Sequence, residues 1–326
     1  MKLFQRELDL GQAVEFGGLT VFPLLGADNG GVDYLTAPEV LDVGLVEVSE
    51  LDNPSVPSLK VTNMADVPVL FVEGQTLIGG DQNRTMNVTI LIPAKSQTAI
   101  PVSCVEAHRW GAATGRAYGS KSKVAPGSLR SAKIAALKYG QLIGDMRSSD
   151  QGRVWAEVER LEAGHQAYSD TAALDDLQDR IEGNLAGHLD QVTPQAHQVG
   201  VVCLAGGRVV GLDVFDKAST LEQYLRPIVG GHTVDAALSA PAEDVDAVDA
   251  IEEFLAQVEA ATVERAEAVG LGEEVHLRDA VNGIALELDG SLVHLAAFPA
   301  RPSLVTADGR ARFSSESVRS PWPGGI

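Results

Sequence analysis

The chain has 326 residues, 45% of them hydrophobic, which supports a substantial core and excludes a disordered protein. Its net charge of −20 argues against general nucleic-acid binding, because neutralising phosphates requires an excess of Lys and Arg. No apolar run approaches the ~20 residues that cross a bilayer, and no apolar signal segment follows Met1. The two cysteines, Cys104 and Cys203, fit no zinc-binding spacing. The sequence therefore predicts a cytosolic globular protein without a membrane partner, and it leaves cofactor and oligomeric state open.

The first 110 residues have a mainly β pattern, rich in Val, Ile, Leu and Phe and interrupted by Gly and Pro. The predicted strands in this part lie within 12–26 and 43–49, and then at 67–72, 88–93 and 99–105. A short helix is predicted to start at Thr36, because Pro38 then lies in its first turn and Glu39 follows.

From residue 126 the apolar residues recur at helical spacing. Residues 126–190 predict a layer of three helical segments. Residues 111–127, rich in Gly, Ser and Lys, predict a flexible connection between this layer and the preceding sheet.

The last third predicts two hairpins around two helices. The first hairpin spans 198–215 and turns at Gly206–Gly207, and the second turns at Asp289–Gly290. Ser219 and Glu222 form an S-x-x-E capping box that predicts a helix start. An amphipathic helix is predicted over 242–268.

This order predicts the α+β class rather than βαβ units. Mainly β N-terminal and C-terminal parts are expected to form one mixed or antiparallel sheet system, with a helical layer inserted in the middle. We predict a single domain over 1–301 and a loose tail over 302–326. The parts of the predicted domain are a β-rich 1–110, a helical insert at 126–190, a hairpin with helices at 198–268 and a β-rich 274–299.

Polar side chains crowd around the strands predicted over 67–105. Those between 73 and 87 are Glu73, Gln75, Asp81, Gln82, Asn83, Arg84 and Asn87, and those at the end of the last strand are Ser103, Cys104, Glu106, His108, Arg109 and Trp110. Polar groups on strand ends are a common way for a rigid sheet to present a site. The pattern predicts a site, but it does not name a reaction.

The same region is a basic island in an acidic chain. Residues 67–140 carry nine basic and three acidic side chains, a net charge of +6 against −26 for the rest. Such an island can focus an anionic ligand. The alternatives are solvated surface charge and internal pairing of Arg84 and Arg109 with Glu73 and Glu106, and they stay open at this point.

The stretch EGQTLIGGDQNRTMNVTILIPAKSQTAIPVSCVEAHRWG, followed later by GRVVGLDVFD, resembles a family found in bacteria and archaea. This is the ARG and rhodanese-phosphatase-superfamily-associated protein domain family, named for its association with ADP-ribosylglycohydrolases and rhodanese-type phosphatases. The resemblance covers most of the chain and falls mainly on Glu73, Gln82, Asn83, Arg84, Asn87, Glu106, Arg109, Trp110 and Asp213. It implies nucleotide-derived or phosphorylated ligands by association, without an established activity.

The candidate ligand-binding residues follow from their chemistry. Arg84 and Arg109 are predicted to hold the charge of the ligand, and Trp110 to offer a ring face to a planar group. Gln82, Asn83 and Asn87 are predicted to orient the ligand through amide hydrogen bonds. The alternatives are that the amides cap backbone groups where the sheet breaks and that Trp110 anchors a core.

Glu73, Glu106 and Asp213 are the candidate acid–base groups or cation ligands, with ion pairing or solvent exposure as the alternatives. Cys104 is a candidate nucleophile beside His108, but its apolar run favours a small buried hydrophobe. The scattered histidines predict no metal site.

These expectations combine into one pocket, built by 67–110 and 211–216, for a small anionic, nucleotide- or ADP-ribose-like ligand. Three classes of function stay open. A hydrolase or transferase predicts an unpaired, abnormally titrating carboxylate. A non-catalytic ligand-sensing or protein-interaction module predicts carboxylates tied into salt bridges, and a purely structural cluster predicts a large loss of stability in Arg84→Ala or Glu73→Ala.

Overall fold

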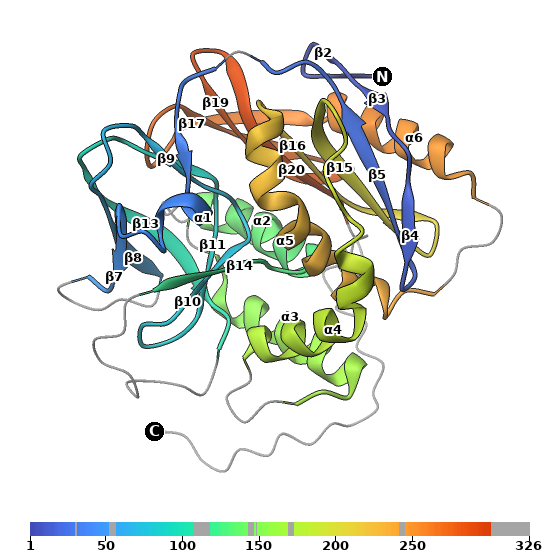
Figure 1. Ribbon diagram of the computed structural model, residues 1–326, viewed down its shortest axis with the longest axis horizontal. Helices are drawn as coiled ribbons and strands as arrows, with labels where there is room; N and C mark the ends of the chain where they lie inside the picture. Colours follow the sequence, from blue (N-terminus) through green and yellow to red (C-terminus); the bar gives the residue numbers. More distant parts are fainter. Residues whose placement is uncertain are drawn as a thin grey trace.

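The computed structural model describes residues 1–29, 31–51, 57–106, 118–142, 147, 149–168, 173–240 and 245–300, with side chains for all of these except 120–122 and 138–142. Figure 1 shows a large sheet beside a smaller group of strands, with helices packed on and between them. The predicted α+β class, with antiparallel sheets and a helical layer in the middle of the chain, is confirmed. The tail predicted over 302–326 lies outside the described residues.

The largest sheet has nine strands, and all of its pairs are antiparallel. The order across it is β17-β18-β19-β20-β16-β15-β5-β3, with β4 also paired to β5. N-terminal and C-terminal strands therefore share one sheet, as predicted. The bounds are β3 Asp9–Leu10, β4 Val14–Phe16, β5 Leu19–Leu25, β15 Gln198–Ala205, β16 Arg208–Phe215, β17 Thr262–Glu267, β18 Glu273–Arg278, β19 Val281–Leu288 and β20 Ser291–Pro299.

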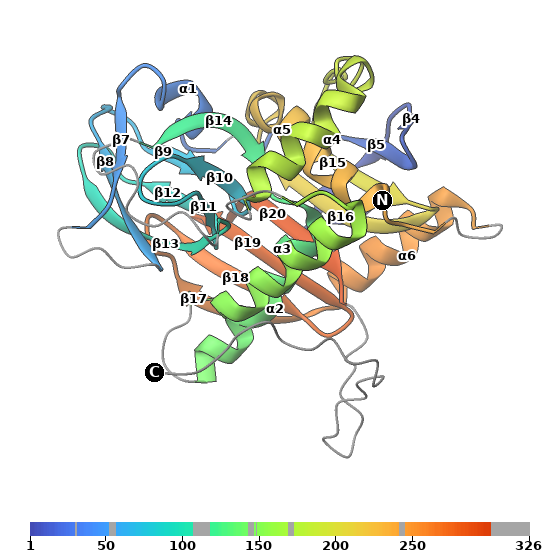
Figure 2. The same cartoon turned by 90° about the horizontal axis from the view of Figure 1, so that it is seen from below.

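A second sheet has six antiparallel strands in the order β14-β10-β11-β13-β8-β7. It curls, because Tyr118 beside β14 donates its backbone N–H to Val48 O of β7 at 3.5 Å and so brings the two edges together (Figure 2). The bounds are β7 Val46–Ser49, β8 Ser58–Asn63, β10 Gln75–Ile78, β11 Arg84–Met86, β13 Gln97–Cys104 and β14 Gly119–Val124.

Two smaller strand groups complete the β structure. A three-stranded sheet runs β12-β9-β6, with β6 parallel to β9. A hairpin of β1 and β2 stands alone at the N-terminus. The bounds are β1 Lys2–Leu3, β2 Arg6–Glu7, β6 Leu35–Thr36, β9 Val69–Phe71 and β12 Ile90–Ile92.

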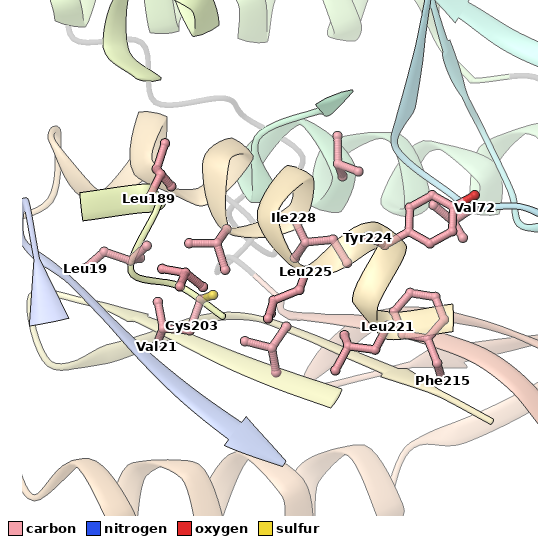
Figure 3. Close-up of a cluster of buried hydrophobic side chains, with 14 of the residues drawn as sticks. Leu19, Val21, Val72, Leu189, Cys203, Phe215, Leu221, Tyr224, Leu225 and Ile228 are labelled. Carbon is pink, nitrogen blue, oxygen red and sulfur yellow. The ribbon is translucent and has the colours of Figure 1, made fainter. Parts of the chain in front are cut away.

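The helices cover both faces of the nine-stranded sheet. Alternate residues of β15 point to opposite sides: Val201 and Cys203 pack with α5, while Val202 and Leu204 pack with α6. Figure 3 shows the α5 side of this core, where Leu225 and other α5 side chains meet the sheet. The bounds are α1 Ala37–Val40, α2 Gly127–Leu142, α3 Gln151–His165, α4 Leu174–Leu189, α5 Ala218–Ala236 and α6 Ala247–Glu259.

Helix α2 lies between the two sheet systems. Its Ile134 and Leu137 belong to a buried cluster that also holds Leu77 of the six-stranded sheet and Phe298 of the nine-stranded sheet. Helices α3 and α4 pack against α2 and α5 through a further apolar cluster. None of the helices in the described chain combines the length and apolar character that a membrane span requires.

Two helix predictions in the last third were wrong in part. The amphipathic helix predicted over 242–268 is confirmed for Ala247–Glu259, but Thr262–Glu267 is an edge strand paired with β18. Helical spacing in the sequence could not reveal this pairing partner. The capping box predicted at Ser219 was also wrong, because α5 begins at Ala218, whose N–H donates to Asp28 Oδ1 from a distant segment.

The predicted strands at 67–72, 88–93 and 99–105 are confirmed as β9, β12 and β13. The polar stretch between the first two, however, is not a plain linker, because it contains β10 and β11. The connection predicted over 111–127 likewise contains β14. These strands are short and polar, so their sequences lack the apolar alternation that predicted the others.

Two glycines allow a matched test of the packing around α5. A Cβ at Gly231 would lie 2.6 Å from Val124 O and 2.8 Å from Ala125 O, both backbone atoms that cannot easily move. Gly183 of α4 has no atom within 4 Å of its Cβ position. We expect urea unfolding to show a lower free energy of unfolding for Gly231→Ala, and a gain of about 0.5–1 kcal/mol for Gly183→Ala from helix propensity. A gain in both variants would contradict the close approach at Gly231.

Candidate functional site

Two of the predicted acidic residues converge on one arginine that was not among the candidates. Arg130 of α2 donates from Nε to Glu73 Oε2 at 2.8 Å. It also donates from Nη1 and Nη2 to both carboxylate oxygens of Asp213, at 3.0 and 2.6 Å. Glu73 follows β9 and Asp213 lies on β16, so the predicted convergence of the two segments does occur. It occurs in the interior, where each of the three side chains is at most 1% exposed.

Three further buried side chains complete this network. Lys133, one turn after Arg130 on α2, lies 3.2 Å from Glu73 Oε1. His294 of β20 lies 3.2 Å from Asp213 Oδ1 through Nε2 and 2.7 Å from Thr89 Oγ1 through Nδ1. This network thus pairs two carboxylates with two cations. We call it the buried charge network; its members are Glu73, Arg130, Lys133, Asp213, His294 and Thr89.

Local structure makes room for the Arg130 side chain. Gly74 has φ +81°, a backbone conformation that favours glycine, and a Cβ there would lie 2.7 Å from Arg130 Nε. Both the backbone conformation and the lack of space therefore require a glycine at this position. The guanidinium carbon of Arg130 also lies 4.9 Å from the centre of the Phe298 ring, a cation–π contact.

The charged groups of the network shift one another's pKa values against the effect of burial. Burial opposes the charge of Arg130, but the carboxylates of Asp213 and Glu73 raise its pKa above the ordinary value. Burial likewise acts to raise the pKa of Asp213, yet the Arg130 guanidinium and the His294 hydrogen bond hold it well below its usual range. Burial lowers the pKa of Lys133, and the neighbouring Glu73 opposes that shift. The structure therefore places Asp213 as the buried ion-pair partner of Arg130.

Internal ion pairing of Glu73, which the sequence left open as an alternative, does occur, but with other partners than expected. Glu73 pairs with Arg130 and Lys133 instead of Arg84. Lys123, another cation of the basic island, pairs with Asp175 and Asp179 of α4. Three cations of the island, Lys123, Arg130 and Lys133, are thus buried and neutralised from within the chain.

Arg84 is the contrasting case. Its side chain is 1% exposed, and its Nη1 donates at 3.0 Å to the neutral amide oxygen Oε1 of Gln82. Its Nε has no hydrogen-bond partner among the described residues. Within the described parts of the chain, no carboxylate lies within the 4.0 Å of an ion pair with this guanidinium. The edge formed by Nε and Nη2, which grips carboxylates and phosphates in a bidentate manner, is left without a partner there.

The sheet register fixes the position of Arg84. It pairs with Leu77 of β10 and Cys104 of β13, and Met86 lies two residues further along its own strand. All four side chains therefore point to the same side of the curled sheet, where Leu77 and Met86 join the apolar core. Arg84 lies at the end of this apolar interior, beside Tyr118, whose hydroxyl is 3.2 Å from Gln82 O.

The other predicted residues of this stretch are engaged in holding the strand ends. Gln82 donates from Nε2 to Glu106 O at 2.9 Å, so its amide is oriented to accept from Arg84. Asn83 Oδ1 accepts the N–H of Gly79 at 3.1 Å, and Glu106 Oε2 accepts the N–H of Asn83 at 3.1 Å. Asn83 and Glu106 therefore cap backbone groups at the point where the sheet breaks.

Asn87 is turned away from Arg84. It accepts from Ser103 Oγ at 2.7 Å and donates to Arg147 O at 3.0 Å. Ser103 and Cys104 are neighbours on β13 and point to opposite faces, so Asn87 and Arg84 lie on different sides of the sheet. His108, Arg109 and Trp110 lie outside the described residues.

Cys104 is fully buried, as the apolar run predicted, and burial raises the pKa of its thiol. Its Sγ lies 3.2 Å from Gln82 Oε1 and 3.0 Å from Glu106 O. A thiol with a raised pKa is a poor nucleophile at neutral pH.

The sequence profile of the ARG and Rhodanese-Phosphatase-superfamily-associated Protein domain matches residues 7–298. The chain belongs to this family. The match spans both the buried charge network and the surroundings of Arg84, so both are parts of the family domain. Comparisons with curated proteins and with solved structures found no match.

Sequence reasoning missed Arg130, Lys133 and His294 as partners of the predicted carboxylates, and it missed Thr89 as the partner of His294. A signal existed for two of them. Arg130 and Lys133 share a helix face with Ile134 and Leu137, which are buried, and cations on an apolar face require buried counter-charges. Nothing in the sequence identified Thr89 or His294, because each contact depends on how separate sheets pack together.

Replacing Arg130 tests the buried charge network. Arg130→Met leaves the carboxylates of Glu73 and Asp213 buried without their shared partner, so we expect the free energy of unfolding to fall by about 3–5 kcal/mol. The matched control is Arg153→Met on α3, which removes a 60% exposed arginine from a surface pair and should change stability by less than about 0.5 kcal/mol. Chemical denaturation measures both, and equal effects would contradict the network.

His232 of α5 provides a pH test of the same region. Burial lowers its pKa from 6.5 to about 4, with Arg130 adding to the shift, and neither ring nitrogen has a hydrogen-bond partner in the part of the chain that the structure describes. The unfolded chain binds a proton at His232 more tightly than the folded chain does. The contribution of neutral His232 to the free energy of unfolding is therefore complete above pH 6.5 and is lost as the pH falls toward 4. The loss amounts to about 3 kcal/mol. Unfolding measured from pH 7.5 to 4 should show this slope in the wild type and a shallower one in His232→Gln.

Proposed function

We propose that this protein binds a small oxyanion, or the terminal oxyanion of a larger ligand, through Arg84, and that it does so without using Glu73 or Asp213 as catalytic groups. The single observation that carries the proposal is the buried Arg84 guanidinium. A buried charge without a counter-ion is costly, so such a group calls for an anion to complete its environment.

The geometry favours a particular class of ligand. Gln82 accepts a hydrogen bond from Nη1 of Arg84. The edge of the guanidinium formed by Nε and Nη2 is left for a carboxylate or phosphate group. The guanidinium is enclosed at the end of the curled sheet, so the group that reaches it has to be small or terminal. The family name links the domain to the rhodanese-phosphatase superfamily, and phosphate-bearing ligands are therefore the first to screen. ADP-ribose and nucleotides belong in that screen on the same ground.

The binding role is favoured over a hydrolase or transferase because of the carboxylates. Glu73 and Asp213 are held in ion pairs with Arg130, and Glu106 accepts a backbone N–H from Asn83. An acid–base catalyst needs a carboxylate that exchanges its proton near neutral pH, and the lowered pKa of Asp213 is opposite to that requirement.

A thermal-shift screen with wild type and Arg84→Met tests this proposal. The screen contains inorganic phosphate, ADP-ribose, NAD, nucleotides, sugar phosphates and small carboxylates, in a chloride buffer free of other oxyanions. A ligand at ~100 times its dissociation constant stabilises the wild type by about 2.7 kcal/mol. Arg84→Met should give no shift, while Arg84→Lys, which keeps the charge but loses the edge of Nε and Nη2, should bind more weakly than wild type.

The unliganded variants provide the control for folding. Arg84→Met removes an unpaired buried charge, so without ligand it should be at least as stable as the wild type. A full shift in Arg84→Met, or no shift in the wild type with any compound, would overturn the binding proposal. Phosphorus NMR of the bound ligand tests the catalytic part, because steady conversion to a product would show that the protein is an enzyme.

A further inference from the structure

A second region, separate in its residues from the surroundings of Arg84, has the opposite charge. A cavity of about 440 Å³ lies where residues 28 and 31–39 meet the first turn of α5. Its lining holds one cation, Lys217, and four carboxylates, Asp28, Asp33, Glu39 and Glu222. We call this region the acidic cavity.

Two of these carboxylates already have structural roles. Asp28 Oδ1 accepts the N–H of Ala218 at 2.9 Å, and Glu39 accepts from both the N–H and the hydroxyl of Thr36. Asp33 and Glu222 make no hydrogen bond or ion pair with any residue in the described ranges. The cavity therefore carries negative charge that the neighbouring chain does not neutralise.

A buried carboxylate lies directly behind the cavity wall. Asp216 is 1% exposed; its Oδ1 accepts from the hydroxyl of Tyr34, but its Oδ2 has no hydrogen-bond partner among the residues that the structure describes. A Cβ on Gly31, which is part of the wall, would lie 3.2 Å from that Oδ2, so no side chain stands between them. Arg6, the nearest buried cation, donates to the carbonyls of Phe215, Ala27 and Asp216 rather than to this oxygen.

A buried carboxylate oxygen that is left without a donor is destabilising. Such an oxygen, close to a wall residue that has no side chain, marks a place where a donor from outside the chain would be stabilised. This observation is independent of the surface carboxylates.

The chain itself shows which kind of donor the cavity accepts. The ammonium of Lys217 lies 4.2 Å from the centre of the Tyr34 ring and donates to Val32 O at 2.6 Å. An ammonium over an aromatic face, with carboxylates around it, is the arrangement by which proteins recognise organic cations. No three His, Cys, Asp or Glu side chains of the described chain converge as metal ligands, so the dispersed carboxylates suit several separate ammonium groups better than one metal ion.

We infer that the acidic cavity binds a polyamine, with one of its ammonium groups over the Tyr34 ring in the place that Lys217 now takes and the others near Asp33 and Glu222. Lys217 is then an internal competitor. Its removal should strengthen binding, whereas removal of Asp33 and Glu222 should weaken it.

Isothermal titration of the full chain with spermidine at low ionic strength tests this inference. Lys217→Gln should tighten binding roughly two- to fivefold, the effect of one exposed cation–π contact. The matched control is Lys95→Gln, which makes the same change in net charge at an exposed lysine paired with Asp66. The double variant Asp33→Asn/Glu222→Gln should weaken binding by up to about tenfold, against little change in Glu252→Gln/Glu253→Gln on α6.

The control variants distinguish a built site from general attraction to an acidic protein. Equal effects of Lys217→Gln and Lys95→Gln, or of the two double variants, would overturn the inference. So would the absence of binding in both the wild type and Lys217→Gln.

Discussion

The ion pairs of Arg130 are the interaction on which the rest of the structure depends. This side chain of α2 binds both Glu73 and Asp213. Glu73 lies between β9 of the three-stranded sheet and β10 of the six-stranded sheet, and Asp213 lies on β16 in the middle of the nine-stranded sheet. Lys133 adds the second cation, so two carboxylates and two cations balance one another in the buried interior. Buried ions are tolerated only when they are paired and hydrogen-bonded, and removing one member exposes the others to the full cost. The relative placement of α2 and the two sheet systems is therefore tied to this network.

The network also changes how the polar residues between 73 and 110 are interpreted. Acidic residues that seemed suited to catalysis are the counter-ions of a buried arginine, and three cations of the basic island, Lys123, Arg130 and Lys133, are neutralised by carboxylates of the chain itself. Against this background, Arg84 differs from Arg130 in one respect: both are buried, but only Arg130 has carboxylates within ion-pair distance in the described chain. Structural networks satisfy their charges, whereas binding sites leave one charge for the ligand. This difference separates the part of the cluster that holds the fold from the part that we propose binds an anion.

The sequence predicted those features that depend on local pattern. Apolar alternation identified β9, β12 and β13, turn glycines identified the hairpins at Gly206–Gly207 and Asp289–Gly290, and Pro38 with Glu39 marked α1. The family followed from the motif around Arg84. Features that depend on distant partners were missed: β17 is an edge strand only because β18 lies beside it, and α5 is capped by Asp28 from another segment. The partners of Glu73 and Asp213 belong to this group, since charges 57 and 83 residues away in the chain meet only after folding.

The most direct test of the account is NMR of the arginine Nε–H groups during a titration with inorganic phosphate. Arg84→Lys and Arg130→Lys assign the two signals by their loss. We predict that phosphate shifts the Arg84 signal, whose Nε has no partner among the described residues, and leaves the Arg130 signal unchanged, because its Nε already donates to Glu73. An unmoved Arg84 signal at saturating phosphate, or a shift of Arg130 instead, would contradict the division of the cluster into a structural network and an anion site.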